Sequence, residues 1–147
     1  MFNLLEKFKI KKESNLTSAA ILIVEDNDAD RILIQRTLEK KNYAVFTAPN
    51  VEGGLSLLQR YKVDLIILDY ILPGLNGLNL CKILKENKRT KNIPIIFITV
   101  VDGGCEIIQF YEAGAEVYLH KPIDSKQLLK EVEQLLVELK QEKVALE

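Results

Sequence analysis

Short runs of consecutive apolar residues limit the fold of this chain more than any other feature of its sequence. Three of them, AILIV (20–24), DLIILD (64–69) and IPIIFIT (93–99), are apolar nearly throughout and have the length of a β-strand. A strand that is apolar at every position has both faces covered, whereas a half-exposed strand alternates apolar and polar residues. We therefore expect three fully buried strands in the middle of a sheet.

Two further strands and five helices complete the expected pattern. YAVFTA (43–48) and EVYLH (116–120) also read as strands. Helical spacing or capping signals follow each strand, over 28–41, 50–58, 78–87, 106–114 and from Asp124 onward. Strict alternation of strands and helices, with burial on both faces, predicts an α/β fold with a parallel sheet between two helical layers. In such folds functional groups gather beyond the carboxyl ends of the strands.

The helix boundaries are predicted from capping residues. Asp28 suits the N-terminus of the first helix, and Asn50 suits a cap for the second. Asp124 and Gln127 have the spacing of a capping box before the long last helix. Gly114 is a suitable end for the helix before the last strand. The helical spacing of the first helix runs through Ile32, Leu33, Gln35, Arg36 and Leu38.

Length, charge and cysteine content narrow the class of protein. A chain of 147 residues favours one domain, and its net charge of −1 argues weakly against binding to nucleic acid or to a membrane surface. No apolar run approaches the roughly 18 residues of a membrane span, and we read no signal peptide. Cys81 and Cys105 are far apart, which is typical of separate thiols in a reducing compartment. We expect a cytoplasmic protein.

Polar residues stand at the ends of four expected strands. Glu25 and Asp26 follow the first, Asp69 the third, Thr99 ends the fourth and Lys121 follows the fifth. Three carboxylates at one site repel one another unless a cation neutralises them, and oxygen ligands in an open site suit Mg²⁺. A lysine and a hydroxyl beside such a cation suit an incoming phosphoryl group, and one carboxylate can be the nucleophile.

Four segments together resemble the response-regulator receiver domain of two-component signalling. They are ILIVEDN (21–27), DLIILDYILPGLNGLNL (64–80), IPIIFIT (93–99) and AGAEVYLHKPID (113–124), and the resemblance covers roughly residues 20–140. It implies a flavodoxin-like, doubly wound five-stranded parallel sheet of order 2-1-3-4-5.

The resemblance also implies a role for individual residues. Asp69 matches the phosphoacceptor, Asp26 the direct metal ligand and Glu25 the acid that usually acts through metal-bound water. The backbone carbonyl of Ile71 matches a further Mg²⁺ ligand. Thr99 and Lys121 match the hydroxyl and the lysine that contact the phosphoryl group, and Tyr118 matches the aromatic residue that switches together with Thr99. Pro122 stands where the family often has a cis peptide bond.

Some residues depart from the family pattern. Val100 replaces the usual small residue after Thr99 and is large enough to crowd the path to the phosphate. Ile71 and Val101 hold positions that tune hydrolysis of the aspartyl phosphate, and neither offers a group that aligns water. We therefore expect a long-lived phosphorylated form. Gly103 and Gly104 make the start of the fourth helix flexible, although a simple turn explains them equally well.

Other polar residues are assigned ordinary structural roles. Asp28 and Asp30 are expected to support the N-terminal end of the first helix and are not counted as metal ligands. His120, the only histidine, is expected to be a strand-edge residue, because no cysteine or second histidine lies near it.

We divide the chain into three parts. Residues 1–18 form an N-terminal extension that is flexible or a short amphipathic helix, residues 19–140 the receiver domain, and residues 141–147 the C-terminal end of an extended last helix. This end is either a solvated tail or a surface that pairs two chains into a homodimer, and we weigh the two equally.

These expectations combine into one functional hypothesis. The chain is a single-domain response regulator of a two-component or phosphorelay pathway. It takes a phosphoryl group from a sensor histidine kinase or a histidine phosphotransfer protein onto Asp69 with Mg²⁺, and it then switches a surface for a downstream protein target. We expect no direct DNA binding, and no enzymatic activity beyond its own phosphorylation and dephosphorylation.

Two alternatives remain open. One is an interaction module that works without phosphorylation. The other is a phosphatase with an aspartyl nucleophile, but such enzymes place a second acid where this chain has Ile71.

Overall fold

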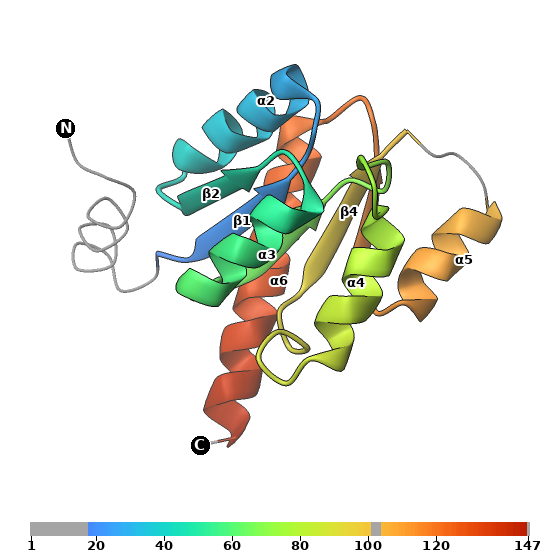
Figure 1. The fold of residues 1–147 in the computed structure, drawn as a ribbon. Coiled ribbons are helices and arrows are strands. Elements are labelled where there is room, and N and C mark those ends of the chain that lie inside the picture. The colour runs from blue at the N-terminus through green and yellow to red at the C-terminus, as the bar shows by residue number, and fades with distance from the viewer. Residues whose placement is uncertain (1–17, 101–103, 147) are drawn as a thin grey trace.

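Five parallel strands alternate with five helices in the computed structural model, which describes residues 18–100 and 104–146 (Figure 1). The elements are β1 (Ala20–Val24), α2 (Asp28–Glu39), β2 (Ala44–Ala48), α3 (Val51–Arg60), β3 (Leu65–Leu68), α4 (Gly77–Glu86), β4 (Ile95–Thr99), α5 (Gly104–Glu112), β5 (Val117–His120) and α6 (Ser125–Leu146). The strand order is β2-β1-β3-β4-β5, with all pairs parallel. The predicted flavodoxin-like fold is confirmed.

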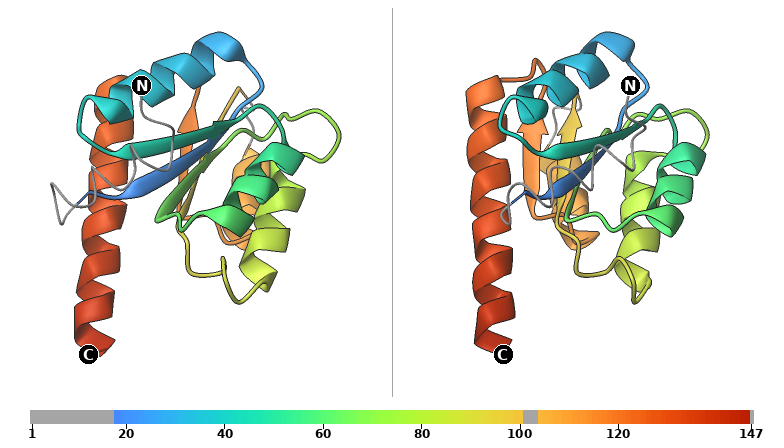
Figure 2. Two further views of the ribbon diagram at one scale, coloured as in Figure 1. Left: turned by 60° about the vertical axis from the view of Figure 1, so that its left-hand side comes forward. Right: turned by 90° about the vertical axis from the view of Figure 1, so that its left-hand side faces the viewer.

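Helices cover both faces of the sheet (Figure 2). On one face, side chains of α2 and α6 pack against the strands, and on the other face α3, α4 and α5 do so. Successive residues of β1 alternate between these two cores: Ile21 and Ile23 belong to one, Leu22 to the other, and all three are fully buried. This two-sided burial explains why the central strands β1, β3 and β4 are apolar except for Thr99 at the end of β4.

Helix α2 begins at Asp28, the residue predicted for its N-terminus, and the structure adds its cap and its buried face. Asn27 is the N-cap, because its side chain accepts a hydrogen bond from the Asp30 N–H at 2.9 Å, and Asp28 is the first helical residue. Ile32 and Leu33, two apolar residues of the predicted helical spacing, are each 43% exposed and so do not belong to the buried face. The buried residues of α2 are Ile34, Thr37 and Leu38.

Other predicted caps are confirmed. The Asn50 side chain accepts a hydrogen bond from the Gly53 N–H at 2.8 Å at the start of α3. Asp124 accepts hydrogen bonds from the backbone N–H groups of Lys126 and Gln127 at the start of α6. Such bonds satisfy donors that have no partner within the helix.

Helix α6 packs on the sheet only through its first half. Leu128, Val132, Leu135 and Leu136 are buried there. Further along the helix, Val144 is 70% exposed. None of the helices within residues 18–100 and 104–146 is both long and apolar enough to cross a membrane.

Some predictions concern residues outside the described ranges. They involve residues 1–17, Val101, Gly103 and the last residue of the segment 141–147. The proposed division of the chain into three parts also stays a prediction.

Candidate functional site

The polar residues at the strand ends meet at one edge of the sheet. Val24 and Leu68 are partners in the pairing of β1 with β3, and Glu25 and Asp69 are the residues that follow them. The N–H of Asp69 also donates a hydrogen bond to the Val24 carbonyl at 3.1 Å. The parallel register therefore places the two acids next to each other.

Three carboxylates form a cluster at this edge. Glu25, Asp26 and Asp69 each offer an oxygen, and these oxygens lie within 4.8 Å of one another. Glu25 and Asp69 are only 2% and 6% exposed, whereas Asp26 is open to solvent. A partly open cluster of three oxygen ligands fits Mg²⁺, which retains water in its coordination shell. Ile71 lies beside the cluster, since its N–H donates to Asp69 Oδ1 at 3.1 Å, but its carbonyl as a ligand stays a prediction.

Lys121 lies at the same edge and pairs with three carboxylates. Its Nζ is 2.5 Å from Glu25 Oε1, 3.0 Å from Asp69 Oδ2 and 3.0 Å from Asp30 Oδ2. The backbone N–H of Lys121 donates to the Thr99 carbonyl at 2.9 Å, and the bond to Pro122 is cis, as in the family pattern. The ammonium has three N–H donors, so these three acceptors can satisfy all of them.

The crowding of charges changes the protonation of the site. Burial, with a smaller contribution from the neighbouring Asp69, raises the pKa of Glu25 from 4.5 to about 8, although Lys121 acts to lower it. For Lys121, burial alone would lower the pKa, but hydrogen bonds to Glu25, Asp30 and Asp69 outweigh burial and raise the pKa. The lysine is therefore charged at neutral pH, and without a bound cation Glu25 retains a proton more readily than an ordinary carboxylate.

Helix α2 holds the loop that carries two of the acids. Arg31 Nη1 donates to the Glu25 carbonyl at 2.9 Å, and Arg31 Nη2 pairs with Asp28 at 2.5 Å. Asp30 reaches Lys121, as described above. Our reading of the sequence assigned Asp30 only to the N-terminal end of this helix and gave Arg31 no role, so it missed their contacts with Lys121 and with the Glu25 carbonyl. Both residues follow the end of β1 by only a few positions, and this closeness was the signal that could have identified them.

Helix α4 approaches the backbone of Asp69. A Cβ atom added at Gly77 would lie 2.1 Å from the Asp69 carbonyl oxygen, and the Gly77 N–H donates to the Tyr70 carbonyl at 2.8 Å. The absence of a side chain at Gly77 therefore allows the helix to support the segment after β3. The sequence motif contained this glycine, but its role was not anticipated.

Thr99 and Tyr118 lie on β4 and β5. Thr99 is fully buried at the end of β4, next to His120 in the register. The Tyr118 ring is half-buried and stacks on Phe110 of α5, with ring centres 5.4 Å apart. Phe110 also contacts Tyr70, the residue after Asp69, at 5.2 Å between ring centres. These rings connect the residue after Asp69 with β5.

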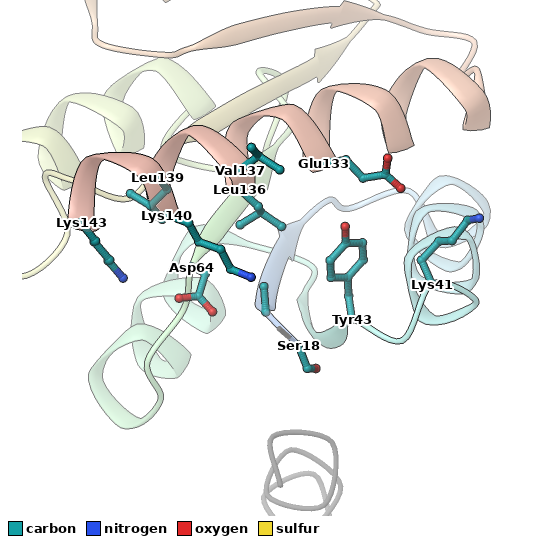
Figure 3. Close-up of a pocket in the computed structure, with 11 residues that line it drawn as sticks. Ser18, Lys41, Tyr43, Asp64, Glu133, Leu136, Val137, Leu139, Lys140 and Lys143 are labelled. Atoms are coloured by element: carbon teal, nitrogen blue, oxygen red, sulfur yellow. The ribbon is translucent and has the colours of Figure 1, made fainter. Parts of the chain in front are cut away.

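The cavity in Figure 3 lies away from this cluster. It measures about 440 Å³, and its lining includes Ala19, Tyr43 and Asp64, which immediately precede β1, β2 and β3. These are the amino ends of the strands, whereas the acids stand at the carboxyl ends. The Asp64 carboxylate there accepts a hydrogen bond from the Ala20 N–H at 2.8 Å, which is an ordinary structural role.

Comparison with known proteins identifies the family of this chain. The model of the response regulator receiver domain matches residues 21–133. The chain is 38% identical over 118 residues to the response regulator PleD of Caulobacter vibrioides, covering 80% of this chain but only 26% of PleD. It is 34% identical over 118 residues to the protein PilH of Pseudomonas aeruginosa, covering 80% of this chain and 98% of PilH.

A solved structure agrees with this assignment. The response regulator receiver domain protein of Methanospirillum hungatei is similar with a TM-score of 0.79 and 26% identity, over 85% of this chain and 98% of that one. Sequence and structure thus lead to the same conclusion. The chain belongs to the response regulator receiver domain family.

Proposed function

We propose that this chain accepts a phosphoryl group on Asp69 from a phosphohistidine of a partner protein. One observation carries the proposal: Asp69 contributes to the three-carboxylate cluster while its Oδ2 lies 3.0 Å from Lys121 Nζ. A nucleophilic carboxylate, a place for a cation and a fixed positive charge are the parts that phosphoryl acceptance requires.

The chemistry assigns a task to each residue. An ionised oxygen of Asp69 attacks phosphorus, the phosphorus–nitrogen bond breaks, and its electron pair returns to the imidazole of the donor. Lys121 opposes the negative charge of the phosphoryl oxygens, and the Thr99 hydroxyl offers a hydrogen-bond donor. When bound by Glu25, Asp26, Asp69 and the Ile71 carbonyl, Mg²⁺ supplies further positive charge at those oxygens.

The partners follow from the family. We propose a sensor histidine kinase or a histidine phosphotransfer protein as the donor, and a downstream protein as the target. The surface around β4, β5 and α5 is our candidate for the switch, because Tyr118 and Phe110 connect it by ring contacts to Tyr70 beside the phosphoacceptor. We propose no direct DNA contact. A cytoplasmic location and homodimer formation stay predictions.

The proposal is tested by incubation with acetyl phosphate and Mg²⁺, followed by intact-mass measurement. We expect a gain of one phosphoryl group that Asp69→Asn abolishes. Asp64→Asn is the matched control, because it removes the same charge just before β3, at the opposite edge of the sheet. That variant should accept the phosphoryl group as the wild type does.

Other outcomes favour the alternatives. No phosphoryl gain from acetyl phosphate or from a phosphorylated histidine kinase would contradict the proposal and favour a phosphorylation-independent module. Repeated turnover of a phosphoester would favour a phosphatase.

A further inference from the structure

The third carboxylate that pairs with Lys121 is not part of the candidate cation site. Asp30 Oδ2 lies 3.0 Å from Lys121 Nζ, but the cluster that could hold a cation consists of Glu25, Asp26 and Asp69. Asp30 belongs to the first turn of α2, whereas Lys121 follows β5. This ion pair therefore connects two residues that are 91 positions apart in the sequence.

Capping of α2 does not account for the position of the Asp30 carboxylate. Asn27 provides the side chain that caps the helix, and the cap hydrogen bond is donated by the backbone N–H of Asp30. Asp28, the other acid of the first turn, pairs with Arg31. The carboxylate of Asp30 instead points to Lys121 and is 31% exposed.

A bound cation would engage two of the three carboxylates that pair with Lys121, but not the third. Glu25 and Asp69 are candidate ligands, so a bound cation competes with Lys121 for the same two carboxylates. Asp30 keeps its carboxylate available, because it lies outside the cluster. One acceptor for the ammonium thus remains when the other two turn to a cation.

From this difference we infer that Asp30 is a positioning residue, which holds Lys121 beside the site when Glu25 and Asp69 are engaged by Mg²⁺. The inference rests on the proposed function for its purpose: Lys121 has to stay in place to meet phosphoryl oxygens. It goes beyond that function because it assigns the orientation of Lys121 to a residue that contacts neither metal nor phosphoryl group.

Loss of Asp30 has two expected consequences. In the loaded protein, Lys121 loses its remaining fixed partner and becomes mobile. In the metal-free protein, Lys121 turns fully to Glu25 and Asp69 and competes more strongly with Mg²⁺ for them. Both consequences act through Lys121, whereas the favourable effect of an acid at a helix N-terminus does not.

The first test observes Lys121 directly by NMR of its ε-methylene group, with and without Mg²⁺. In the wild type, a fixed ammonium keeps the two ε protons inequivalent under both conditions. We expect Asp30→Asn to average them in the presence of Mg²⁺. Asp28→Asn is the matched control, because it removes one charge from the same helical turn but leaves the partners of Lys121 intact. Asp30→Asn spectra identical to the control would overturn the inference.

The second test compares Mg²⁺ affinity in two backgrounds. Asp30→Asn should weaken Mg²⁺ binding about two- to fivefold more than Asp28→Asn does, the range expected of a partly exposed ion pair. In a Lys121→Met background this excess should shrink, because the lysine through which Asp30 acts is absent. An undiminished excess would show that Asp30 acts only as a nearby charge, and the inference would be wrong.

Phosphorylation of the wild type separates this inference from the proposed function. If the wild type accepts no phosphoryl group but both tests give the expected results, the proposed function fails while the role of Asp30 stands. If the wild type is phosphorylated and Asp30→Asn matches Asp28→Asn in both tests, only the inference about Asp30 fails.

Discussion

At the scale of single residues, Glu25 shows how the site lowers the stability of the folded protein. It is buried beside another acid, Asp69, and Lys121 is the cation that pairs with both of them among the described residues. A carboxyl whose pKa is raised in the folded state binds a proton more tightly there than in the unfolded chain. Protonation of Glu25 therefore favours folding, and its ionisation opposes folding.

The stability of the metal-free protein should accordingly fall as pH rises. The pKa of Glu25 moves from 4.5 to about 8 on folding, so its contribution is complete below pH 4.5 and is lost as pH rises through about 8. Thermal unfolding with a chelator, from about pH 5.5 to about pH 8.5, measures this slope. Glu25→Gln should flatten it, and an equal slope in both proteins would contradict our account of Glu25.

Bound Mg²⁺ should offset the loss of stability that the ionised carboxyl of Glu25 causes. A ligand that binds only the folded state stabilises it, by about 2.7 kcal/mol at a concentration 100 times its dissociation constant. We expect Mg²⁺ to raise the melting temperature and Asp26→Asn to reduce that gain, because Asp26 is the solvent-facing acid of the cluster. Asp64→Asn, far from the cluster, should keep the full gain. Equal gains in wild type and Asp26→Asn would count against a metal site here.

Ile71 is expected to prolong the phosphorylated state. Its backbone N–H bonds to Asp69, but its exposed side chain offers no polar group that would align a water molecule. Ile71→Asn adds an amide at this place, and one hydrogen bond in the transition state accelerates hydrolysis on the order of tenfold. Intact mass over time, after removal of the donor, measures the decay. Wild-type decay within seconds would refute a long-lived form.

At the scale of secondary-structure elements, the strands were easier to predict than the faces of the helices. The apolar runs of β1, β3 and β4 are short and rich in β-branched residues, which favours strands in a sheet that is covered on both sides. In α2, by contrast, Ile32, Leu33 and Ile34 are three consecutive apolar residues. Spacing alone permits more than one buried face, and the position of the sheet selects the face with Ile34.

The candidate site could likewise be predicted only in part. Glu25, Asp26, Asp69 and Lys121 were found because they stand at strand ends, which the topology brings together. The ion pair of Asp30 with Lys121 was missed, because it depends on how the loop after β5 lies over the first turn of α2. That is a tertiary contact, which the pattern of either segment alone does not reveal.

The contact between α4 and Asp69 gives a prediction for this scale. Gly77→Ala should lower stability by about 1–3 kcal/mol, since the added methyl meets the Asp69 backbone and forces a shift. It should also slow phosphoryl acceptance. Gly104→Ala is the control at another helix start, where a Cβ meets nothing within 4 Å. Denaturant unfolding compares the two, and an equal effect of both substitutions would argue against a special role for Gly77.

At the scale of the whole molecule, α6 divides into a packed and an exposed half. Leu128→Ala removes a fully buried side chain and should cost about 2–5 kcal/mol. Val144→Ala should change stability by less than about 0.5 kcal/mol if that half faces water. Denaturant unfolding at several protein concentrations tests both. A concentration-dependent loss in Val144→Ala would instead indicate that a second chain covers this half.

Helix α6 also sets a distance that matters for anyone who labels this protein. It begins at Ser125, four residues after Lys121, and leads away from the acidic cluster to the C-terminal end (Figure 1). Twenty-two residues at ~1.5 Å each rise about 33 Å. A fluorophore or fusion partner attached at that end is thus held away from the acidic cluster. The helix makes the C-terminus a suitable place for a reporter that must leave phosphotransfer undisturbed.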